Sequence, residues 1–413
     1  VDSHGKTLVA GLTPVDEVIS TLLSQVVAMD ETEVVSLRLA RGRILAQSIN
    51  ATVDVPPHDN SAMDGYAFNA RDDSIVAGGR YAVSDRIAAG HVGKALEPGT
   101  LARIFTGAPI PEGANAVVIQ EDTRMSESGI ELTERPELGA NVRPRGQDIA
   151  LGSQLLGRGH QLKAADVGLL ASTGVNQVEV FRKLKIAIMS TGDELVEPPN
   201  ALAPGQIYNS NHYTLAAMIE ELGMEVVDLG LVPDSLSATV EALATGAETA
   251  DCIISSGGVS VGEEDHVKAA VENLGRLDLW KVAIKPGKPL AFGFVRATSD
   301  ADAIPFFGLP GNPVSSFVTF TVIAKPYLLK FQGNESAVGN SLYAMSQFDF
   351  KTGGRREYLR VRVSGGNELN AELYDGQGSG VMSSVSWANA LAEIEADTQV
   401  FAGDKIKVHL LPN

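Results

Sequence analysis

A glycine-rich loop is the first segment of this sequence whose residue types suggest chemistry. The segment SSGGVSVGEED follows the apolar run DCII, and Gly257, Gly258 and Gly262 allow its backbone to approach a ligand closely. A helix that begins near Glu263 would present free N–H groups and the positive end of its dipole to an anion. The pattern matches neither the GxxxxGK(S/T) phosphate loop nor GxGxxG, which disfavours an ordinary ATPase or a dinucleotide dehydrogenase. A phosphate cradle and a simple tight turn are equally good interpretations of this loop alone.

Acidic side chains follow two of the apolar runs. Asp193 and Glu194 lie in TGDEL, after KIAIM, and Asp265 lies in GEEDH. Because ligands of open α/β sheets collect beyond the carboxyl ends of the strands, we expect these loops to share one edge. Carboxylate oxygens with several waters suit Mg²⁺, which usually arrives with substrate phosphates and stabilises a leaving phosphate. The simpler interpretation is helix capping by Asp193 and a solvated acidic surface around Glu263 and Glu264.

Three lysines occur close together in the segment WKVAIKPGKP. Lys281, Lys285 and Lys288 surround Pro286 and Gly287, a rigid turn that could direct ammonium groups toward an oxyanion. Surface lysines are usually solvated, so each one singly indicates little. Cations beside a glycine-rich loop in a strongly acidic chain nevertheless indicate a selected anion site.

A stiff loop follows the apolar run IPFF. Pro310, Gly311 and Pro313 in GLPGNPVSS precede a helix expected at 314–320. This loop either shapes a pocket or only turns the chain.

Other common catalytic arrangements have little support. His58, Asp59, Asn60 and Asp64 are too closely spaced for a typical structural zinc site, and no set of cysteines supports one. The single Cys252 is interpreted as a buried small hydrophobic residue rather than a reactive thiol. No Ser-His-Asp arrangement is recoverable from the spacing, and GxSxG is absent.

The net charge of −18 disfavours partners that are themselves polyanions. Non-specific binding to nucleic acid or to an anionic membrane through the whole surface is therefore not expected. No apolar run approaches the roughly 20 residues that span a bilayer, and the first residues lack the features of a signal peptide, so we expect a cytoplasmic protein.

The hydrophobic patterns predict an α/β multidomain chain, because 413 residues exceed the roughly 100 to 200 residues of one domain. Residues 13–28 have the apolar spacing of one amphipathic helix, and 52–151 contain short β-prone runs. Residues 183–330 alternate apolar runs with helical segments, which predicts a doubly wound, mostly parallel sheet with helices on both faces. From about residue 331, short alternating strands predict a β-barrel or sandwich.

Several long motifs also occur in a recognisable order along residues 12–411. They are DNSAMDGYA, RIFTGAPIPEGANAVVIQED, RPRGQDI, STGDEL, GQIYNSN, SSGGVSVGEED, AIKPGKPLAFG and GLPGNPVSS. This series resembles the MoeA family of molybdopterin molybdenumtransferases and the related C-terminal domain of gephyrin. The segment RATSDADA at 296–303 is longer and more polar than the family pattern and is predicted to form an exposed hairpin tip.

The resemblance implies an elongated homodimer with four domains per subunit and a site shared between the subunits. The implied domains are a MogA-like α/β catalytic domain at 10–28 and 183–330, a β-rich protruding domain at 52–151, a linking domain at 29–51 and 152–182, and a C-terminal β-barrel domain at 331–413. The family's reaction inserts molybdenum from molybdate into adenylylated molybdopterin, uses Mg²⁺ and releases AMP. A molybdopterin adenylyltransferase is the implied upstream partner.

The matching motifs also imply roles for individual residues. The resemblance implies that Asp193, Glu194 and Asp265 handle the metal. The implied catalytic positions are Asp64, Thr106, Asp148, Glu194, Asp265, Lys281 and Lys285, with Asp64 and Thr106 supplied by the opposite subunit. The implied pterin- and phosphate-binding positions are Thr191, Gly192, Gly257, Gly258, Val259, Ser260, Lys288, Pro310, Gly311 and Pro313.

Two other hypotheses keep the same α/β fold. The chain could be the preceding adenylyltransferase or a nucleotide-amide hydrolase of the competence-damage type, although DNSAMDGYA and RGQDI argue against both. It could instead be a non-enzymatic scaffold, as in gephyrin, where this domain also binds receptor peptides. A eukaryotic scaffold would bring a further N-terminal domain and a long linker, which this sequence does not contain, so we expect the plain enzyme.

Overall fold

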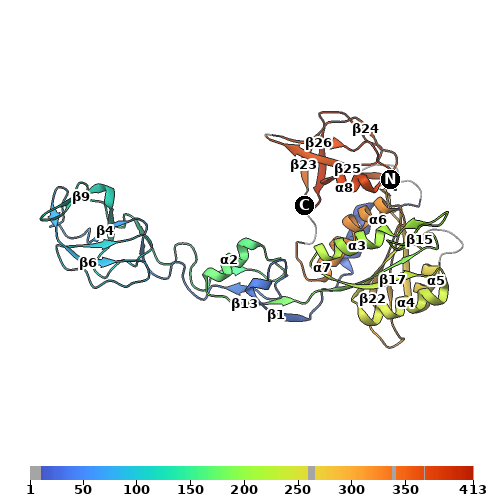
Figure 1. Cartoon of the computed structure of the whole chain (residues 1–413), viewed down its shortest axis with the longest axis horizontal. Helices are drawn as coiled ribbons and strands as arrows, with labels where there is room; N and C mark the ends of the chain where they lie inside the picture. Colours follow the sequence, from blue (N-terminus) through green and yellow to red (C-terminus); the bar gives the residue numbers. More distant parts are fainter. Residues whose placement is uncertain (1–10, 259–265, 337–340, 367, 413) are drawn as a thin grey trace.

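The computed structural model describes residues 11–258, 266–336, 341–366 and 368–412. The molecule is elongated, with a β-rich unit at one end, a small linking unit in the middle, and an α/β unit beside a β-barrel at the other end (Figure 1). No helix among the described residues combines the length and apolar character needed to cross a membrane.

A six-stranded sheet forms the centre of the α/β unit, in the order β17-β14-β18-β22-β21-β19. Its strands are β14 Lys185–Thr191, β17 Glu225–Val232, β18 Cys252–Ser256, β19 Gly275–Lys281, β21 Pro289–Val295 and β22 Ile304–Leu309. Within this sheet β21 alone runs against the others, because it pairs antiparallel with both β19 and β22. Residues 296–303 connect β21 to β22 as the predicted hairpin tip. The prediction of a mostly parallel sheet is confirmed.

Helices cover both faces of this sheet. On β14, Ile186 and Ile188 pack in one buried cluster, whereas Ala187 and Met189 pack in another, because successive strand residues point to opposite faces. The first face carries α1 Val15–Ser24, α3 Ser210–Glu221, α6 Pro313–Thr319 and α7 Lys325–Phe331, with a π-helical turn at Phe320–Ala324. The second face carries α4 Leu236–Thr249 and α5 His266–Leu274. The unit is therefore doubly wound, as predicted.

Helix α1 is shorter than the predicted span of 13–28. It ends at Ser24, and the backbone N–H of Gln25 donates back to Leu22. Beyond it, the N–H of Met29 donates to the carbonyl of Phe331 at the end of α7. A tertiary hydrogen bond thus replaces the last helical turn, and the apolar spacing could not indicate this.

The β-rich unit consists of short strands around two small cores. A four-stranded sheet has the order β6-β7-β4-β8, and a three-stranded sheet has the order β5-β10-β9. The strands are β3 Asn60–Ser61, β4 Gly65–Phe68, β5 Arg80–Tyr81, β6 Val83–Ile87, β7 Leu101–Ile104, β8 Ala116–Ile119, β9 Thr123–Ser126, β10 Gly129–Leu132 and β11 Val142–Arg143. The linking unit contains β1 Thr32–Ser36, β2 Ile49–Asn50, β12 Gln154–Leu156, α2 Ala164–Ser172 and β13 Gln177–Phe181.

The C-terminal strands form the predicted barrel. Five strands close in the order β25-β26-β23-β29-β27, because β27 also pairs with β25. They are β23 Leu342–Ser346, β25 Arg356–Gly365, β26 Leu369–Leu373, β27 Ala390–Ile394 and β29 Lys405–Leu410, with β24 Phe350–Lys351, β28 Gln399–Val400 and helix α8 Met382–Trp387 alongside. A two-residue strand of the α/β unit, β20 Ile284–Lys285, extends this sheet by pairing parallel to β25. The barrel is therefore attached directly to the lysine-rich loop.

Candidate functional site

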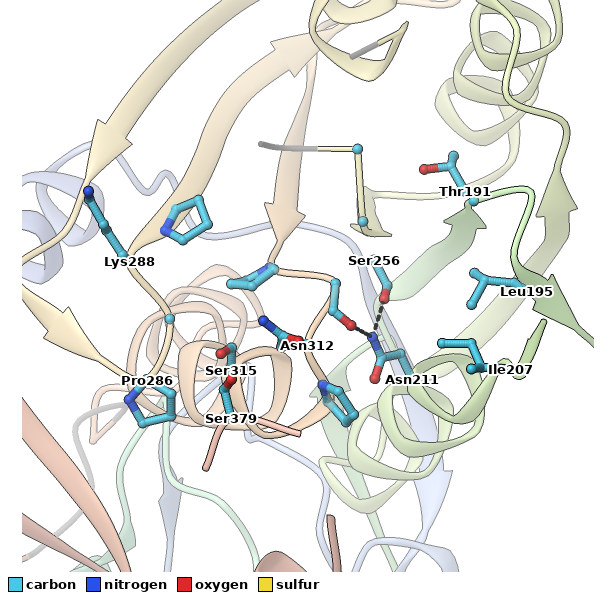
Figure 2. Close-up of a pocket in the computed structure, with 18 of the residues that line it drawn as sticks. Thr191, Leu195, Ile207, Asn211, Ser256, Pro286, Lys288, Asn312, Ser315 and Ser379 are labelled. Atoms are coloured by element: carbon cyan, nitrogen blue, oxygen red, sulfur yellow. Dashed lines mark hydrogen bonds between the residues drawn. The ribbon is translucent and has the colours of Figure 1, made fainter. Parts of the chain in front are cut away.

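A pocket of about 810 Å³ lies beyond the carboxyl ends of β14, β18 and β22. Three loops at this sheet edge contribute to its wall: 191–195 after β14, 256–258 after β18, and 310–315 before and within the start of α6. These are the loops that the sequence singled out, and they meet because parallel strands end at the same edge. Figure 2 shows Thr191, Ser256 and Asn312 around this space.

The glycines of the β18 loop are required by its conformation. Gly257 and Gly258 have φ angles of +92° and +64°, values that L side chains rarely adopt. A Cβ on Gly258 would lie 2.4 Å from Cγ2 of Val267 on α5, and a Cβ on Gly257 would lie 2.9 Å from the carbonyl oxygen of Thr191. The loop therefore follows a path that only glycine can take at these two positions, and its role as a phosphate cradle stays a prediction.

Asn211 joins two of the pocket loops. This residue lies in the first turn of α3, is buried, and its Nδ2 donates to Oγ of Ser256 at 2.8 Å and to the carbonyl of Gly311 at 2.7 Å (Figure 2). The sequence interpretation did not assign Asn211 a role. The sequence did contain an indication of this role. Asn209 already caps α3, so the second asparagine, Asn211, is available for another contact.

Cationic groups reach the pocket from two parts of the chain. Lys285 and Lys288 come from the lysine-rich loop, and Arg355 comes from the segment preceding β25 of the barrel. The ammonium group of Lys285 lies 3.0 Å from Oε1 of Glu357, whose side chain is only 4% exposed. The guanidinium of Arg355 donates to the carbonyl of Ile284 at 3.1 Å. Both contacts link the barrel to the loop that carries the lysines.

The two predicted lysines do not share one environment. Lys285 lines the pocket, whereas Lys281 is exposed at the end of β19 and does not line it. The carbonyl of Lys281 instead accepts the N–H of Thr13, 2.8 Å away, ahead of α1. The role implied for the Lys281 side chain stays a prediction.

Among the described residues, two carboxylates line the pocket, Glu194 and Asp234. Asp193 is exposed beside them and is not among the lining residues. The described part of the chain contains no group of three His, Cys, Asp or Glu residues placed to hold a metal. Mg²⁺ usually binds one or two carboxylates together with substrate phosphates and waters, so this donor set fits a shared magnesium site rather than a closed protein cage.

Three predicted positions cannot be compared with this geometry. Val259, Ser260 and Asp265 lie outside the described residues. Thr191, Gly192, Pro310, Gly311 and Pro313 do line the pocket, as does Lys288.

The barrel supplies a wall that the sequence did not predict. Gln377, Gly378 and Ser379 line the pocket beside the start of α6. The side chain of Gln377 exchanges hydrogen bonds with the backbone of Arg360, at 2.9 and 3.0 Å. The carbonyl of Ser379 accepts the N–H of Val314 in α6 at 3.0 Å. This wall comes from the weakly patterned tail, so no local motif indicated it.

Two of the predicted residues of the β-rich unit, Asp64 and Thr106, contact each other away from the pocket. The backbone N–H and the hydroxyl of Thr106 both donate to Oδ1 of Asp64, at 2.7 and 2.9 Å, and these hydrogen bonds lower the pKa of the Asp64 carboxyl. Asp148 is exposed in the loop after β11. Strand β4, which directly follows Asp64, lies at the opposite end of the molecule from β22 (Figure 1). Within one subunit, the β-rich unit does not contribute to the pocket.

Three family models match almost the whole chain. Residues 13–174 match the MoeA N-terminal region (domain I and II), 187–330 match a probable molybdopterin binding domain, and 344–411 match the MoeA C-terminal region (domain IV).

Individual relatives agree with these models. The chain is 38% identical to a molybdopterin molybdenumtransferase of Haemophilus influenzae, over 96% of this chain and 99% of the relative. It is 36% identical to one of Nostoc, over 99% of this chain and 95% of the relative. Among solved structures, the molybdopterin biosynthesis moeA protein of Pyrococcus horikoshii OT3 superposes with a TM-score of 0.84 at 29% identity, over 97% of this chain and all of that one.

Proposed function

We propose a mechanism for this chain, which belongs to the MoeA family and is a molybdopterin molybdenumtransferase of molybdenum cofactor biosynthesis. It inserts molybdenum from molybdate into adenylylated molybdopterin, with Mg²⁺-dependent release of AMP, in the pocket at the sheet edge. The observation that carries this proposal is the convergence of the β18 glycines with Lys285 and Arg355 on one space of about 810 Å³.

The pocket residues have complementary roles toward an anionic substrate. The backbone of Gly257 and Gly258 lies against the pterin and its phosphate, and the roles proposed for Val259 and Ser260 are contacts to the same groups. The cations of Lys285, Lys288 and Arg355 attract the oxygens of molybdate and phosphate, and a guanidinium can bind two of these oxygens at once. Pro310 and Pro313 form a rigid side wall. This selected positive site offsets the repulsion that a chain of net charge −18 would exert on such a substrate.

Magnesium is proposed to be held by Glu194 together with Asp193 and Asp265. When bound, Mg²⁺ withdraws charge from the phosphoanhydride and stabilises the leaving phosphate. The carboxylate of Glu194 lies over Gly192, where an added Cβ would be 2.6 Å from its Oε2, so this side chain is held close to the β14 loop. Glycine at position 192 thus keeps room for the carboxylate at the pocket edge.

The complete site is proposed to require a homodimer. Asp64 and Thr106 of a second copy, and Asp148 with them, would reach the pocket that their own subunit cannot reach. The hydrogen bonds from Thr106 lower the pKa of the Asp64 carboxyl and favour its ionised form, which suits a group that holds a cation. A molybdopterin adenylyltransferase of the same compartment, which we propose to be the cytoplasm, supplies the adenylylated substrate.

The direct test is to incubate the protein with adenylylated molybdopterin, molybdate and Mg²⁺ and to measure AMP by chromatography. We expect AMP release by the wild type and its loss after thorough chelation. Lys285→Ala should lower kcat/KM by about 100-fold, because one charge-assisted contact to the reacting anion is worth roughly 3 kcal/mol.

A matched control is Lys351→Ala, which removes an exposed lysine of the barrel away from the pocket. It should turn over like the wild type. Normal AMP release by Lys285→Ala, or undiminished release in chelator, would contradict the proposed mechanism.

A further inference from the structure

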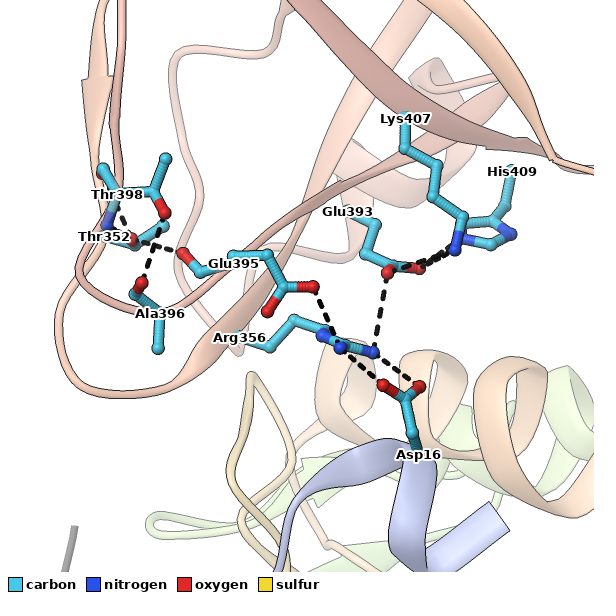
Figure 3. Close-up of polar contacts among 9 residues, drawn as sticks. All are labelled: Asp16, Thr352, Arg356, Glu393, Glu395, Ala396, Thr398, Lys407 and His409. Carbon is cyan, nitrogen blue, oxygen red and sulfur yellow. Dashed lines mark hydrogen bonds and ion pairs between the residues drawn. The ribbon is translucent and has the colours of Figure 1, made fainter. Parts of the chain in front are cut away.

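The start of strand β25 is held from both of its faces. Arg355, directly before the strand, lines the pocket, and Glu357 contacts the pocket lysine Lys285. Arg356 lies between them and points the other way, toward α1, because successive residues of an extended chain alternate in direction. Figure 3 shows Arg356 reaching Asp16 on that helix.

The contact between Arg356 and Asp16 joins the barrel to the α/β unit. Nη1 and Nη2 of Arg356 donate to the two carboxylate oxygens of Asp16 at 2.8 and 2.7 Å. The Arg356 side chain is 15% exposed and that of Asp16 is 72% exposed. This bidentate geometry restricts both the distance and the rotation between the two groups. We call this contact the Asp16 latch.

Arg356 has further partners within the barrel itself. Glu393 on β27 lies 3.4 Å away and Glu395 lies 2.9 Å away. These two carboxylates balance the guanidinium without help from α1 (Figure 3). Asp16 is therefore dispensable for the charge balance of the barrel, and its effect is confined to how the barrel meets the α/β unit.

The backbone pairing at this junction is short. Strand β20 pairs with β25 through only Ile284 with Arg356 and Lys285 with Glu357. The N–H of Arg356 donates to the carbonyl of Ala283 at 3.1 Å. Within the barrel, β25 is fixed by five residue pairs with β26 and five with β27, so its own register does not depend on β20. Its docking onto the lysine-rich loop rests on the two pairs with β20 and on side-chain contacts, so a bidentate contact at this junction has a large effect on how β25 meets Lys285.

We propose that the Asp16 latch is a positioning element of the active site, which holds β25 of the barrel against β20 so that Arg355 lines the pocket and Glu357 holds Lys285 beside it. Asp16 is a positioning residue in this proposal, since it touches neither substrate nor reacting atoms. The inference rests on the proposed function, in which Lys285 and Arg355 bind the substrate anion. It assigns a role in substrate binding to the start of α1, outside the pocket.

The test is the variant Asp16→Asn in the full-length protein. Without the latch, the docked arrangement of β25 on β20 is populated for a smaller fraction of the time, and the apparent dissociation constant rises in inverse proportion to that fraction. We expect the KM for molybdate to rise about 3- to 10-fold while kcat changes less than about twofold. The backbone amides of residues 283–287 and 356–358 should exchange with deuterium about tenfold faster than in the wild type.

The matched control is Glu17→Gln, which removes the same charge from the next residue of α1. Glu17 is exposed and forms no ion pair within the described residues. It should leave both the KM and the exchange rates unchanged. Raising the salt concentration should narrow the difference between wild type and Asp16→Asn, because Asp16 is solvent-exposed and its attraction is screened.

Two results would contradict the positioning role proposed for Asp16. The first is an Asp16→Asn protein with wild-type exchange at residues 283–287 and wild-type KM. The second is a change of equal size in Glu17→Gln, because the effect would then come from the net charge of α1 and not from the contact with Arg356. Failure of the proposed function is separate: a wild type that releases no AMP refutes that function, whereas the exchange measurement still decides whether Asp16 holds β25 against β20.

Discussion

At the scale of single residues, Gly258 shows how tightly the pocket loop is packed. Its φ of +64° is left-handed, and a Cβ there would meet Val267 at 2.4 Å and the hydroxyl of Thr191 at 3.0 Å. Val267 is itself buried on α5, so it has little room to yield. The loop can therefore take this close path beside α5 only because position 258 carries no side chain.

We predict that Gly258→Ala lowers the free energy of unfolding by about 1 to 3 kcal/mol. The rate of AMP release should fall by more than the loss of folded protein accounts for. The loop must move away from Val267 to accept the methyl group, which displaces its amides from the substrate. Urea unfolding followed by circular dichroism, with steady-state turnover, measures both effects.

The control is Gly42→Ala. Gly42 has a similar φ of +81°, but no atom lies within 4 Å of the added Cβ. It should show the backbone cost of about 1 kcal/mol without loss of turnover. Equal behaviour of the two variants would mean that close packing at Gly258 has no part in the site.

At the scale of elements, the barrel is stabilised by a buried carboxylate at its junction with α1. The Glu393 side chain is 7% exposed, and burial alone would raise its pKa. The hydrogen bond from His409 and the charges of Arg356 and Lys407 outweigh burial and lower the pKa of Glu393 to about 2 (Figure 3). The ionised form is thus favoured in the folded barrel.

This depressed pKa predicts an acid-sensitive barrel. The contribution of Glu393 is fully present above its ordinary pKa of 4.5 and is lost as the pH falls from there toward about 2. At pH 6, Glu393→Gln should destabilise the barrel by on the order of 3 kcal/mol. The difference in unfolding free energy between the variant and the wild type should be smaller at pH 3 than at pH 6, as measured by urea unfolding at both pH values.

Glu372→Gln is a suitable control, because Glu372 is an exposed carboxylate on β26 of the same barrel. Its effect should stay within about 0.5 kcal/mol at both pH values. A Glu393→Gln protein whose deficit is the same at pH 3 and pH 6 would refute the electrostatic origin of the stabilisation.

At the scale of the whole molecule, the distance between the β-rich unit and the pocket makes dimerisation testable. Asp64 and Lys285 lie in units at opposite ends of one subunit, so a site that uses both must combine two copies. A heterodimer of Asp64→Asn with Lys285→Ala would then contain one intact site and one doubly altered site. We expect each variant alone to be nearly inactive and the purified heterodimer to recover about half of wild-type turnover per dimer.

Two affinity tags isolate the heterodimer, and analytical ultracentrifugation verifies its mass. An inactive heterodimer of correct mass would show that Asp64 and Lys285 act within one chain or that Asp64 has no part in the reaction.

The sequence by itself determined the loops of the α/β unit. Apolar runs alternating with helices indicated parallel strands, and parallel strands bring the loops after β14, β18 and β22 to one edge without any knowledge of distant contacts. The glycines, Lys285 and the proline loop could be chosen on that basis, and the motifs identified the family. The β-barrel was predicted from its alternation, but its relation to the pocket was not.

Only the tertiary structure decided which residues complete the pocket. Arg355 and Gln377 enter it from the barrel, and Lys281 is separated from Lys285 although both belong to one short segment. These outcomes depend on how β25 docks against β20 and on the ion pair between Arg356 and Asp16, which are 340 residues apart. Contacts between segments so distant leave no local periodicity in the chain, because each partner needs only to be an ordinary strand or helix until folding brings them together.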